Sequence, residues 1–186
     1  MSEFLLKALP LSGLFSVQHK RFEDDRGHFA RLFCEGSLNA FGQPFHIRQI
    51  NRSCTRLRGS VRGLHYQNSN APEAKLVTCL RGEVWDVAVD LRPDSGTFLQ
   101  WHAEHLKAGD GRSLLIPAGF AHGFQTLSDD AELLYLHSAD YTPEHEGGLS
   151  VNDPRLAIAW PLSVNNLTTR DACHPLLDEH FSGVRL

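Results

Sequence analysis

The sequence predicts a mainly β protein: an antiparallel jelly roll, a cupin-like β-sandwich or barrel, with short flanking helices. Three observations support this prediction. Eight short β-like runs follow one another, turn residues separate them, and no long helical pattern intervenes. Many short strands joined by tight turns favour an antiparallel sandwich or barrel over a parallel α/β fold. The open edges of such sheets can be covered by dimerisation.

The expected strands are, in chain order, residues 45–51, 60–66, 74–81, 83–92, 98–106, 113–116, 123–127 and 132–138. Turn signals rich in Gly, Pro, Asp and Ser separate them, at 81–82, 93–96, 109–111, 117–119 and 128–130. Helices are expected only at 35–41 and 171–181. A chain of 186 residues has room for one core, so we expect one jelly-roll domain over residues 1–186.

The run 83–92 alternates most clearly between two faces. Its apolar face consists of Trp85, Val87, Val89 and Leu91. Its other face carries carboxylates and consists of Val84, Asp86, Ala88 and Asp90. A period of two is the signature of a strand. We expect the apolar face to lie outward and the acidic face to line a polar interior between two sheets.

Composition excludes several classes of protein. Hydrophobic residues make up 41% of the chain and charged residues 22%, with a net charge of −4. This balance excludes disordered, collagenous and membrane-spanning chains, and it supplies no basic field for nucleic acid. An anionic small ligand needs only a few local cations. The four cysteines lack paired spacing and no signal segment is evident, so we expect reduced thiols and a cytoplasmic protein.

Candidate chemical groups cluster in the predicted strands. Arg62 and His65 lie three residues apart, and Gly63 between them permits close approach of backbone or ligand. A strand histidine is more often structural, but the neighbouring pattern favours a functional His65. Lys75 is either a solvated rim residue or, if it points inward, a point charge suited to a phosphate or an enolate.

Two further candidates have a structural alternative. His122 is either a packed core histidine or part of a pocket wall. Asp171 is either the N-cap of the last helix or the carboxylate that orients an imidazole. The chain has only three tyrosines, Tyr66, Tyr135 and Tyr141, and each lies beside other candidate polar groups.

Other site chemistries lack support in the sequence. The chain has no HxH pair, and His102 and His105 fall on opposite faces of one expected strand, so we expect no metal site. His137 and His145 also lack partner spacing. No nucleophile elbow, Walker loop or dinucleotide fingerprint is present. The remaining possibility is proton transfer by His, Tyr, Asp and Lys side chains.

The chain resembles the dTDP-4-dehydrorhamnose 3,5-epimerase family, the jelly-roll epimerases of nucleotide-sugar biosynthesis. The resemblance covers about residues 22–177 and rests on an ordered set of motifs rather than on any one of them. They are DDRGHFARLF (24–33), QINRS (49–53), RGLHYQ (62–67), KLVTCLRGEVWDVAVDLR (75–92), IPAGFAHGF (116–124), ELLY (132–135), YTPEHEGG (141–148), NDP (152–154), WPL (160–162) and TTRDACHPLL (168–177).

The resemblance implies roles for the matching residues. His65 matches the general base, Asp171 its paired carboxylate, Tyr135 the general acid on the opposite face of the sugar, and Lys75 the lysine near the C4 oxygen. Ligand-contact positions are matched by Arg26, Gln49, Asn51, Arg62, His122, Tyr141, Glu146 and Arg170. The family also implies a homodimer, an N-terminal segment that crosses to the partner's pocket, and no metal or organic cofactor.

These residue types suit an epimerase. A C4 ketone acidifies the C–H bonds at C3 and C5, so a base can remove a proton from one face while a separate acid returns one to the other. The implied substrate is a nucleotide-diphospho-4-keto-6-deoxyhexose. Its implied conversion takes dTDP-4-dehydro-6-deoxy-D-glucose to dTDP-4-dehydro-L-rhamnose, a deoxysugar precursor of lipopolysaccharide or other products.

Four positions depart from the family pattern. Ile50 replaces an acidic residue, Arg31 a glutamate near the base, Leu136 a frequent lysine and Val151 a frequent tryptophan. The alternatives are therefore an epimerase acting at C3 or C5 only and an epimerase of a CDP- or GDP-linked 4-ketosugar. Two alternatives belong to other functional classes: a noncatalytic sugar-binding jelly roll and a metal-dependent cupin.

Overall fold

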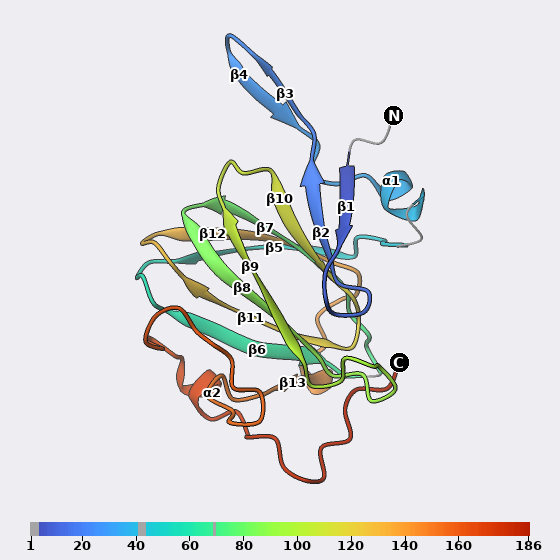
Figure 1. Cartoon of the computed structure of the whole chain (residues 1–186), viewed down its shortest axis with the longest axis vertical. Helices are drawn as coiled ribbons and strands as arrows, with labels where there is room; N and C mark the ends of the chain where they lie inside the picture. The colour runs from blue at the N-terminus through green and yellow to red at the C-terminus, as the bar shows by residue number, and fades with distance from the viewer. Residues whose placement is uncertain (1–3, 41–43, 69) are drawn as a thin grey trace.

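Two antiparallel sheets pack face to face in the computed structural model, which describes residues 4–40, 44–68 and 70–186 (Figure 1). One sheet has the strand order β1-β2-β10-β7-β12-β5 and the other β13-β6-β11-β8-β9. A separate hairpin of β3 and β4 projects away from both sheets (Figure 1). The architecture confirms the predicted antiparallel jelly roll.

The six-stranded sheet consists of β1 (Phe4–Ala8), β2 (Phe15–His19), β10 (Arg112–Ile116), β7 (Lys75–Arg81), β12 (Ala131–His137) and β5 (Gln49–Thr55). The five-stranded sheet consists of β13 (Glu146–Gly148), β6 (Val61–Gln67), β11 (Phe120–Thr126), β8 (Glu83–Asp90) and β9 (Trp101–Lys107). The remaining elements are the hairpin β3 (Arg21–Asp24) and β4 (Gly27–Ala30), the helices α1 (Glu35–Ala40) and α2 (Thr169–Ala172), and the 3₁₀ turn η1 (Pro143–His145).

All eight expected strands are present, but five others were missed. The hairpin β3–β4 has almost no buried residue, so it shows no alternation that could predict a strand. The strands β1 and β2 were likewise unpredicted, and β13 spans only three residues. The expected strand at 45–51 is displaced, because Phe45 leaves the sheet to pack in one cluster with Leu38 of α1.

The two expected helices differ in outcome. The first is α1; its expected last residue, Phe41, lies outside the described residues. The second was expected over 171–181 and is wrong in length, since α2 spans only Thr169–Ala172. Pro175 cannot continue a helix. The chain instead runs as an irregular segment that buries Leu177 and Val184.

Three apolar clusters hold these layers together. Between the sheets, Val77 and Leu114 of one sheet pack in a cluster with Ala88 and Phe124 of the other. The outer face of the five-stranded sheet, including Val87 and the other apolar positions of β8, is covered by the C-terminal segment. This confirms the outward apolar face expected for 83–92.

The remaining outer face, on the six-stranded sheet, packs against α1 and its neighbours. Leu76 and Leu136 lie in this third cluster with Leu38. Val151, another departure from the family pattern, is buried in the C-terminal cover, where its carbonyl accepts a hydrogen bond from Trp160. Leu136 and Val151, which both depart from the family pattern, thus lie at apolar packing positions.

The four cysteines, Cys34, Cys54, Cys79 and Cys173, are not paired with one another in the structure. Among the described residues, every helix is too short or too polar to cross a lipid bilayer.

Candidate active site

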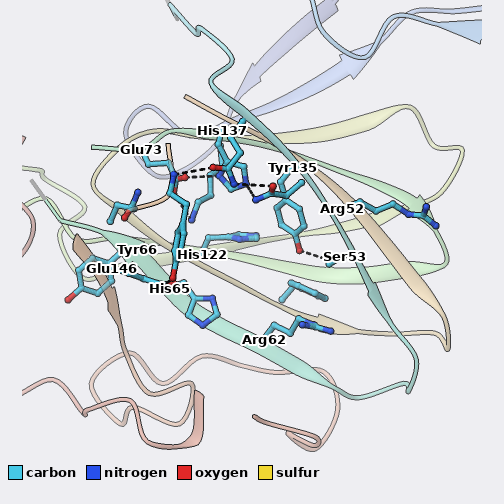
Figure 2. A pocket seen from close by; sticks show the side chains of 16 residues that line it. Arg52, Ser53, Arg62, His65, Tyr66, Glu73, His122, Tyr135, His137 and Glu146 are labelled. Carbon is cyan, nitrogen blue, oxygen red and sulfur yellow. Dashed lines mark hydrogen bonds and ion pairs between the residues drawn. The ribbon is translucent and has the colours of Figure 1, made fainter. Parts of the chain in front are cut away.

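A cavity of about 310 Å³ lies between the two sheets (Figure 2). Nine of the predicted site residues line it: Gln49, Asn51, Arg62, His65, Lys75, His122, Tyr135, Tyr141 and Glu146. Other lining residues had no predicted role in this site, among them Ser53, Tyr66, Glu73, Phe124 and His137. The topology thus brings side chains from distant parts of the chain into one hollow.

Strand periodicity explains why the six-stranded sheet presents these groups. Along β12, Tyr135 and His137 face the cavity, whereas Leu136 between them packs on the outer face. On the neighbouring β5, Asn51 pairs directly with Tyr135. Ile50 is 59% exposed and is absent from the cavity lining, so the missing acidic residue at this position does not alter the cavity wall.

Two glycines shape the opposite wall. A Cβ on Gly63 would lie 2.7 Å from the Cα of Gly123, and a Cβ on Gly123 would lie 2.8 Å from the Arg62 carbonyl oxygen. The close approach permitted by Gly63 is therefore one between strands β6 and β11. Their register places His122 directly opposite His65, beside an irregularity in the pairing.

His65 forms a hydrogen-bonded pair with Asp171. Its Nε2 donates to the Asp171 carboxylate over 2.7 Å, and the Asp171 side chain is only 5% exposed. Burial lowers the pKa of His65 below its ordinary value of 6.5, while the hydrogen bond and charge of Asp171 act in the opposite direction. A neutral imidazole is therefore favoured near pH 7. Since a carboxylate only accepts, Nε2 carries the proton and Nδ1 the lone pair.

The helix α2 delivers Asp171 to this position. Its N-cap is Thr168, whose hydroxyl accepts from the Asp171 backbone N–H. The N-cap interpretation of Asp171 is therefore wrong, because its carboxylate is engaged by the His65 imidazole and not by the helix end.

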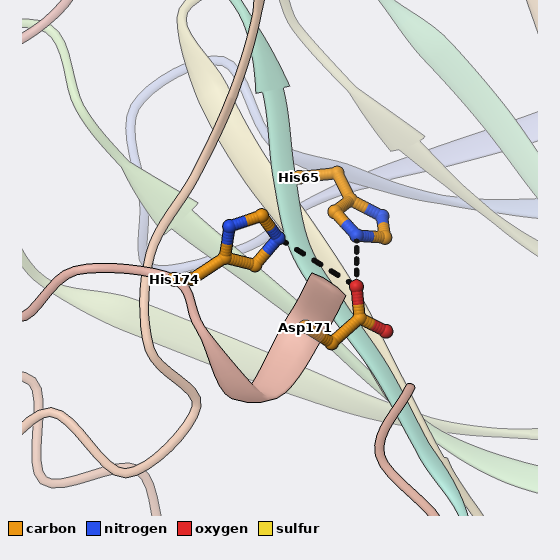
Figure 3. Close-up of side chains that lie close together, drawn as sticks. All are labelled: His65, Asp171 and His174. Carbon is orange, nitrogen blue, oxygen red and sulfur yellow. Dashed lines mark hydrogen bonds and ion pairs between the residues drawn. The ribbon is translucent and has the colours of Figure 1, made fainter. Parts of the chain in front are cut away.

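A second imidazole approaches the same carboxylate (Figure 3). The Nε2 atom of His174 lies 3.6 Å from Asp171 Oδ1, and among the described residues this buried nitrogen has no hydrogen-bond partner. The ring has space only because residue 148 is glycine, where a Cβ would lie 2.2 Å from it. The ligand atoms of His65, Asp171 and His174 lie within 4.8 Å of one another, close enough to hold a metal ion.

His174 was not recognised in the sequence. Its ring and that of His65 come from distant segments, β6 and the residues just after α2, so close spacing along the chain could not reveal the pair. In the structure His65 Nε2 and Asp171 Oδ1 are already bonded to each other, so an ion would have to displace that bond.

Tyr135 is the most deeply placed phenol of the cavity wall. Its hydroxyl shares a 3.0 Å hydrogen bond with Ser53, and its ring stacks on His137 with centroids 5.9 Å apart. The His122 ring meets it edge-on at 6.1 Å. Burial raises the pKa of Tyr135 well above its ordinary value, and the bond to Ser53 opposes only part of that rise. The group therefore remains a neutral proton donor at physiological pH.

His122 combines the two roles that the sequence left open. It is buried and also lines the cavity, and its Nε2 donates over 2.7 Å to Asp86, which is fully buried. Asp86 lies on the inward face of β8, as the alternation of that strand predicted.

Lys75 points inward and is held by a glutamate. Its Nζ lies 3.1 Å from Glu73 Oε2, and the side chains are 12% and 7% exposed. The other Glu73 oxygen accepts from His137 Nδ1 over 2.7 Å. Burial opposes ionisation of Glu73, but the contacts with His137 and Lys75 bring its pKa below the ordinary value. The sequence held one indication that His137 faces the cavity: it lies two residues after Tyr135, so both side chains fall on the same face of one strand.

The rim of the cavity carries a second charged group. Tyr141 donates its hydroxyl to Glu146 over 2.7 Å, and Arg170 forms an ion pair with the same carboxylate at 2.5 Å. Burial opposes ionisation of Glu146, yet these two partners lower its pKa. The adjacent residues Arg170 and Asp171 thus make two different contacts. Arg170 pairs with the Glu146 carboxylate, and Asp171 accepts a hydrogen bond from His65 with its own carboxylate.

Arg26 and Arg31 lie away from this cavity. Arg26 lies in the turn between β3 and β4, where its side chain is 90% exposed and pairs with Asp24. The carbonyl of Arg31 accepts from His19 Nδ1 at the base of the hairpin. Within this chain, neither residue joins the other predicted site residues.

Comparisons with known proteins agree with this arrangement. A family model described as dTDP-4-dehydrorhamnose 3,5-epimerase matches residues 8–179. The dTDP-4-dehydrorhamnose 3,5-epimerase of Pseudomonas aeruginosa is 49% identical over 155 residues, 83% of this chain and 84% of that protein. The crystal structure of a Legionella pneumophila 3,5-epimerase in complex with dTDP-4-keto-L-rhamnose has a TM-score of 0.90 at 37% identity and covers 98% of both chains.

A further solved relative carries a narrower name. The structure of a 3'-monoepimerase from Streptomyces bikiniensis, in complex with dTDP-quinovose, has a TM-score of 0.84 at 35% identity. The match covers 90% of this chain and 85% of that one. The family match covers most of the chain, and these similarities extend over nearly its whole length. The chain therefore belongs to the dTDP-4-dehydrorhamnose 3,5-epimerase family.

Proposed function

We propose that this protein epimerises a dTDP-linked 4-keto-6-deoxyhexose at C3 and C5, converting dTDP-4-dehydro-6-deoxy-D-glucose to dTDP-4-dehydro-L-rhamnose. One observation carries the proposal beyond family membership. A hydrogen-bonded imidazole–carboxylate pair and a partly buried phenol open onto the same cavity from different sheets. Inversion at carbon needs a proton acceptor and a proton donor on opposite sides of one sugar ring, and this arrangement supports such a pair.

His65 is the proposed base. Its Nδ1 lone pair removes the proton from C3 or C5, and the electron pair of the C–H bond moves into an enolate whose charge rests on the C4 oxygen. Asp171 holds the ring in the required tautomer and stabilises the imidazolium that forms.

Tyr135 is the proposed acid and Lys75 the electrophilic group. Tyr135 returns a proton from its hydroxyl to the opposite face of the carbon, and the enolate collapses to the ketone. Solvent then takes the proton from the His65 imidazolium and returns one to the Tyr135 phenolate, so that both groups are restored. The Lys75 ammonium stabilises the C4 oxygen where negative charge develops. Its low exposure strengthens that interaction, because little water screens the charge.

The remaining cavity residues are proposed to hold the nucleotide sugar. Arg62 and His122 are assigned to the sugar and diphosphate, and Tyr141 to the nucleotide at the rim. Gln49, Asn51, Glu146 and Arg170 are assigned further ligand contacts. The low exposure of His122 and the rim position of Tyr141 agree with these depths.

We further propose a cytoplasmic homodimer of single jelly-roll subunits, 1–186, in which the β3–β4 hairpin reaches the partner's cavity. The hairpin projects from its own subunit (Figure 1). It exposes Phe22 and Phe29, which are 47% and 63% exposed. Arg26 at its tip would then contact the partner's ligand, which accounts for its distance from the cavity of its own chain.

The alternative within this chemistry is inversion at one carbon, as the name of the Streptomyces bikiniensis relative states for that protein. Both activities use the same base and acid, so the choice depends on how the sugar ring can turn within the cavity.

The test is a panel of nucleotide-diphospho-4-ketosugars incubated with the protein in D2O and followed by NMR. The proposal predicts deuterium at both C3 and C5 of the dTDP-linked sugar, with inversion. Label at one carbon identifies a monoepimerase, and preference for a CDP- or GDP-linked sugar changes the substrate. Binding of the ketosugar without any exchange contradicts an enzymatic function.

A further inference from the structure

We propose that Glu73 is a positioning residue for the epimerase reaction: its carboxylate holds the Lys75 ammonium and sets the direction of a hydrogen-bond chain along the cavity wall. The inference rests on the proposed function only in the role it gives to Lys75. The orientation of the chain is a property of the protein alone. Figure 2 shows Glu73, His137 and Tyr135 side by side on this wall.

The chain of hydrogen bonds has two ends whose roles cannot be exchanged. At one end, the Tyr141 backbone N–H donates to Gln49 Oε1 over 3.0 Å. At the other end, the Glu73 carboxylate accepts from His137 Nδ1 over 2.7 Å. A backbone N–H can only donate and a carboxylate can only accept. Every bond between these ends must therefore run in one direction.

The intermediate bonds follow that direction. Gln49 donates its Nε2–H to Asn51 Oδ1 over 3.0 Å. Asn51 in turn donates its Nδ2–H to His137 Nε2 over 3.3 Å. His137 must then be neutral, with its proton on Nδ1 and a lone pair on Nε2. The two fixed ends remove the usual ambiguity of amide and imidazole orientation.

Only a carboxylate can serve both neighbours of residue 73. One oxygen accepts from His137, and the other lies 3.1 Å from the Lys75 ammonium. A glutamine of the same size has one acceptor oxygen, so its amide N–H group must face either the ammonium or the His137 nitrogen. The first choice puts donor against donor at Lys75. The second reverses the chain until it meets the Tyr141 N–H, which cannot be reversed.

The surroundings make this arrangement persist. Glu73 and Lys75 are nearly buried, so water cannot readily replace a lost partner. The ring of His137 also stacks on Tyr135, at 5.9 Å between centroids and an angle of 23°. The position of the proposed acid and that of the lysine are thus both tied to one carboxylate.

The first test needs no variant and no substrate. The protein is labelled with ¹⁵N and ¹³C on histidine, and the ring nitrogen shifts of His137 are recorded at neutral pH. The proposal predicts a neutral ring protonated on Nδ1. A ring protonated on Nε2, or on both nitrogens, overturns it. This result is independent of whether the proposed epimerase activity is found.

The second test compares Glu73→Gln with Glu83→Gln. The control removes the carboxylate that accepts from His105 over 2.8 Å, a more exposed imidazole–carboxylate pair away from the cavity. For Glu73→Gln we expect His137 to lose its single tautomer and kcat to fall about 10- to 100-fold, with KM changed less, because Lys75 acts on the enolate. Wild-type kcat in Glu73→Gln, or an equal loss in the control, overturns the proposal.

Discussion

The two walls of the cavity hold their chemical groups in different ways. On the five-stranded sheet, His65 is 31% exposed, and its Nε2 is bonded to a carboxylate that arrives 106 residues later in the chain. On the six-stranded sheet, Lys75 is 12% exposed and pairs with Glu73, two residues before it, and Tyr135 shares its hydrogen bond with Ser53 of the neighbouring β5. The five-stranded wall is thus open at His65, although its His122 is buried, whereas the six-stranded wall is closed around Lys75.

This difference matches the two halves of the proposed reaction. A base must accept a proton in every turnover and release it, so access to solvent and a pKa below the ordinary value suit His65. An acid that must stay protonated is served by burial, which raises the pKa of Tyr135. Burial thus acts on both groups in the direction that favours their neutral forms.

The largest effect is expected from removal of the base on the open wall. His65→Asn should lower kcat by about 10²- to 10⁴-fold, because no other group takes up the C3 and C5 protons. Deuterium uptake at both carbons, measured by NMR, should be lost together. His105→Asn, which changes a histidine outside the cavity, should leave uptake intact. Rapid uptake in His65→Asn would assign the base elsewhere.

A smaller effect is expected from loss of the Asp171 carboxylate, which holds the His65 ring. Asp171→Asn keeps the shape of the side chain but removes its charge, so the imidazole is less well oriented and its cation is less stable. We expect kcat to fall about 10- to 100-fold, as misplacement of a catalytic group does. A steady-state assay that finds wild-type kcat would show that α2 has no part in catalysis.

The pH profile tests the same wall more finely. Since only neutral His65 can act as base, kcat/KM should rise tenfold per pH unit at low pH and level off above the pKa of His65 in the free enzyme. Burial places that midpoint below 6.5. Asp171 opposes this shift, so Asp171→Asn should move the midpoint further down. A midpoint above 6.5 would contradict the effect assigned to burial.

The smallest effect concerns the space around the His174 ring, beside Asp171. A Cβ at Gly148 would lie 2.2 Å from the His174 ring, so Gly148→Ala should destabilise the fold by about 1–3 kcal/mol. Urea denaturation measures this change. Gly96→Ala is the matched control, since among the described residues nothing lies within 4 Å of its added Cβ. Equal stabilities for the two variants would show that the His174 ring moves freely.

Sequence reasoning predicted the parts of the site that depend on local pattern. Alternation along β8 placed Asp86 on an inward face, and the resemblance carried by the ordered motifs identified His65, Lys75 and Tyr135. The pairings between distant segments could not be predicted in this way. Glu73 lies 64 residues before His137, and only the register of β7 against β12 brings them together.

Two failures have a similar cause. The length of the last helix was overestimated, because burial of Leu177 against the five-stranded sheet outweighed the helical tendency of 171–181. His174 went unnoticed because its relation to His65 depends on how that same segment folds back. Long-range packing, which a single sequence does not display, decided both.

The claim that two opposite walls supply base and acid is tested most directly by Tyr135→Phe in D2O. Exchange of the C3 and C5 protons should continue while formation of the inverted product falls at least about tenfold, because His65 still removes protons but the far face lacks its donor. NMR of the recovered sugar measures both quantities in one sample. Unchanged inversion in this variant, or loss of exchange and inversion in equal measure, would show that Tyr135 is not the acid opposite His65.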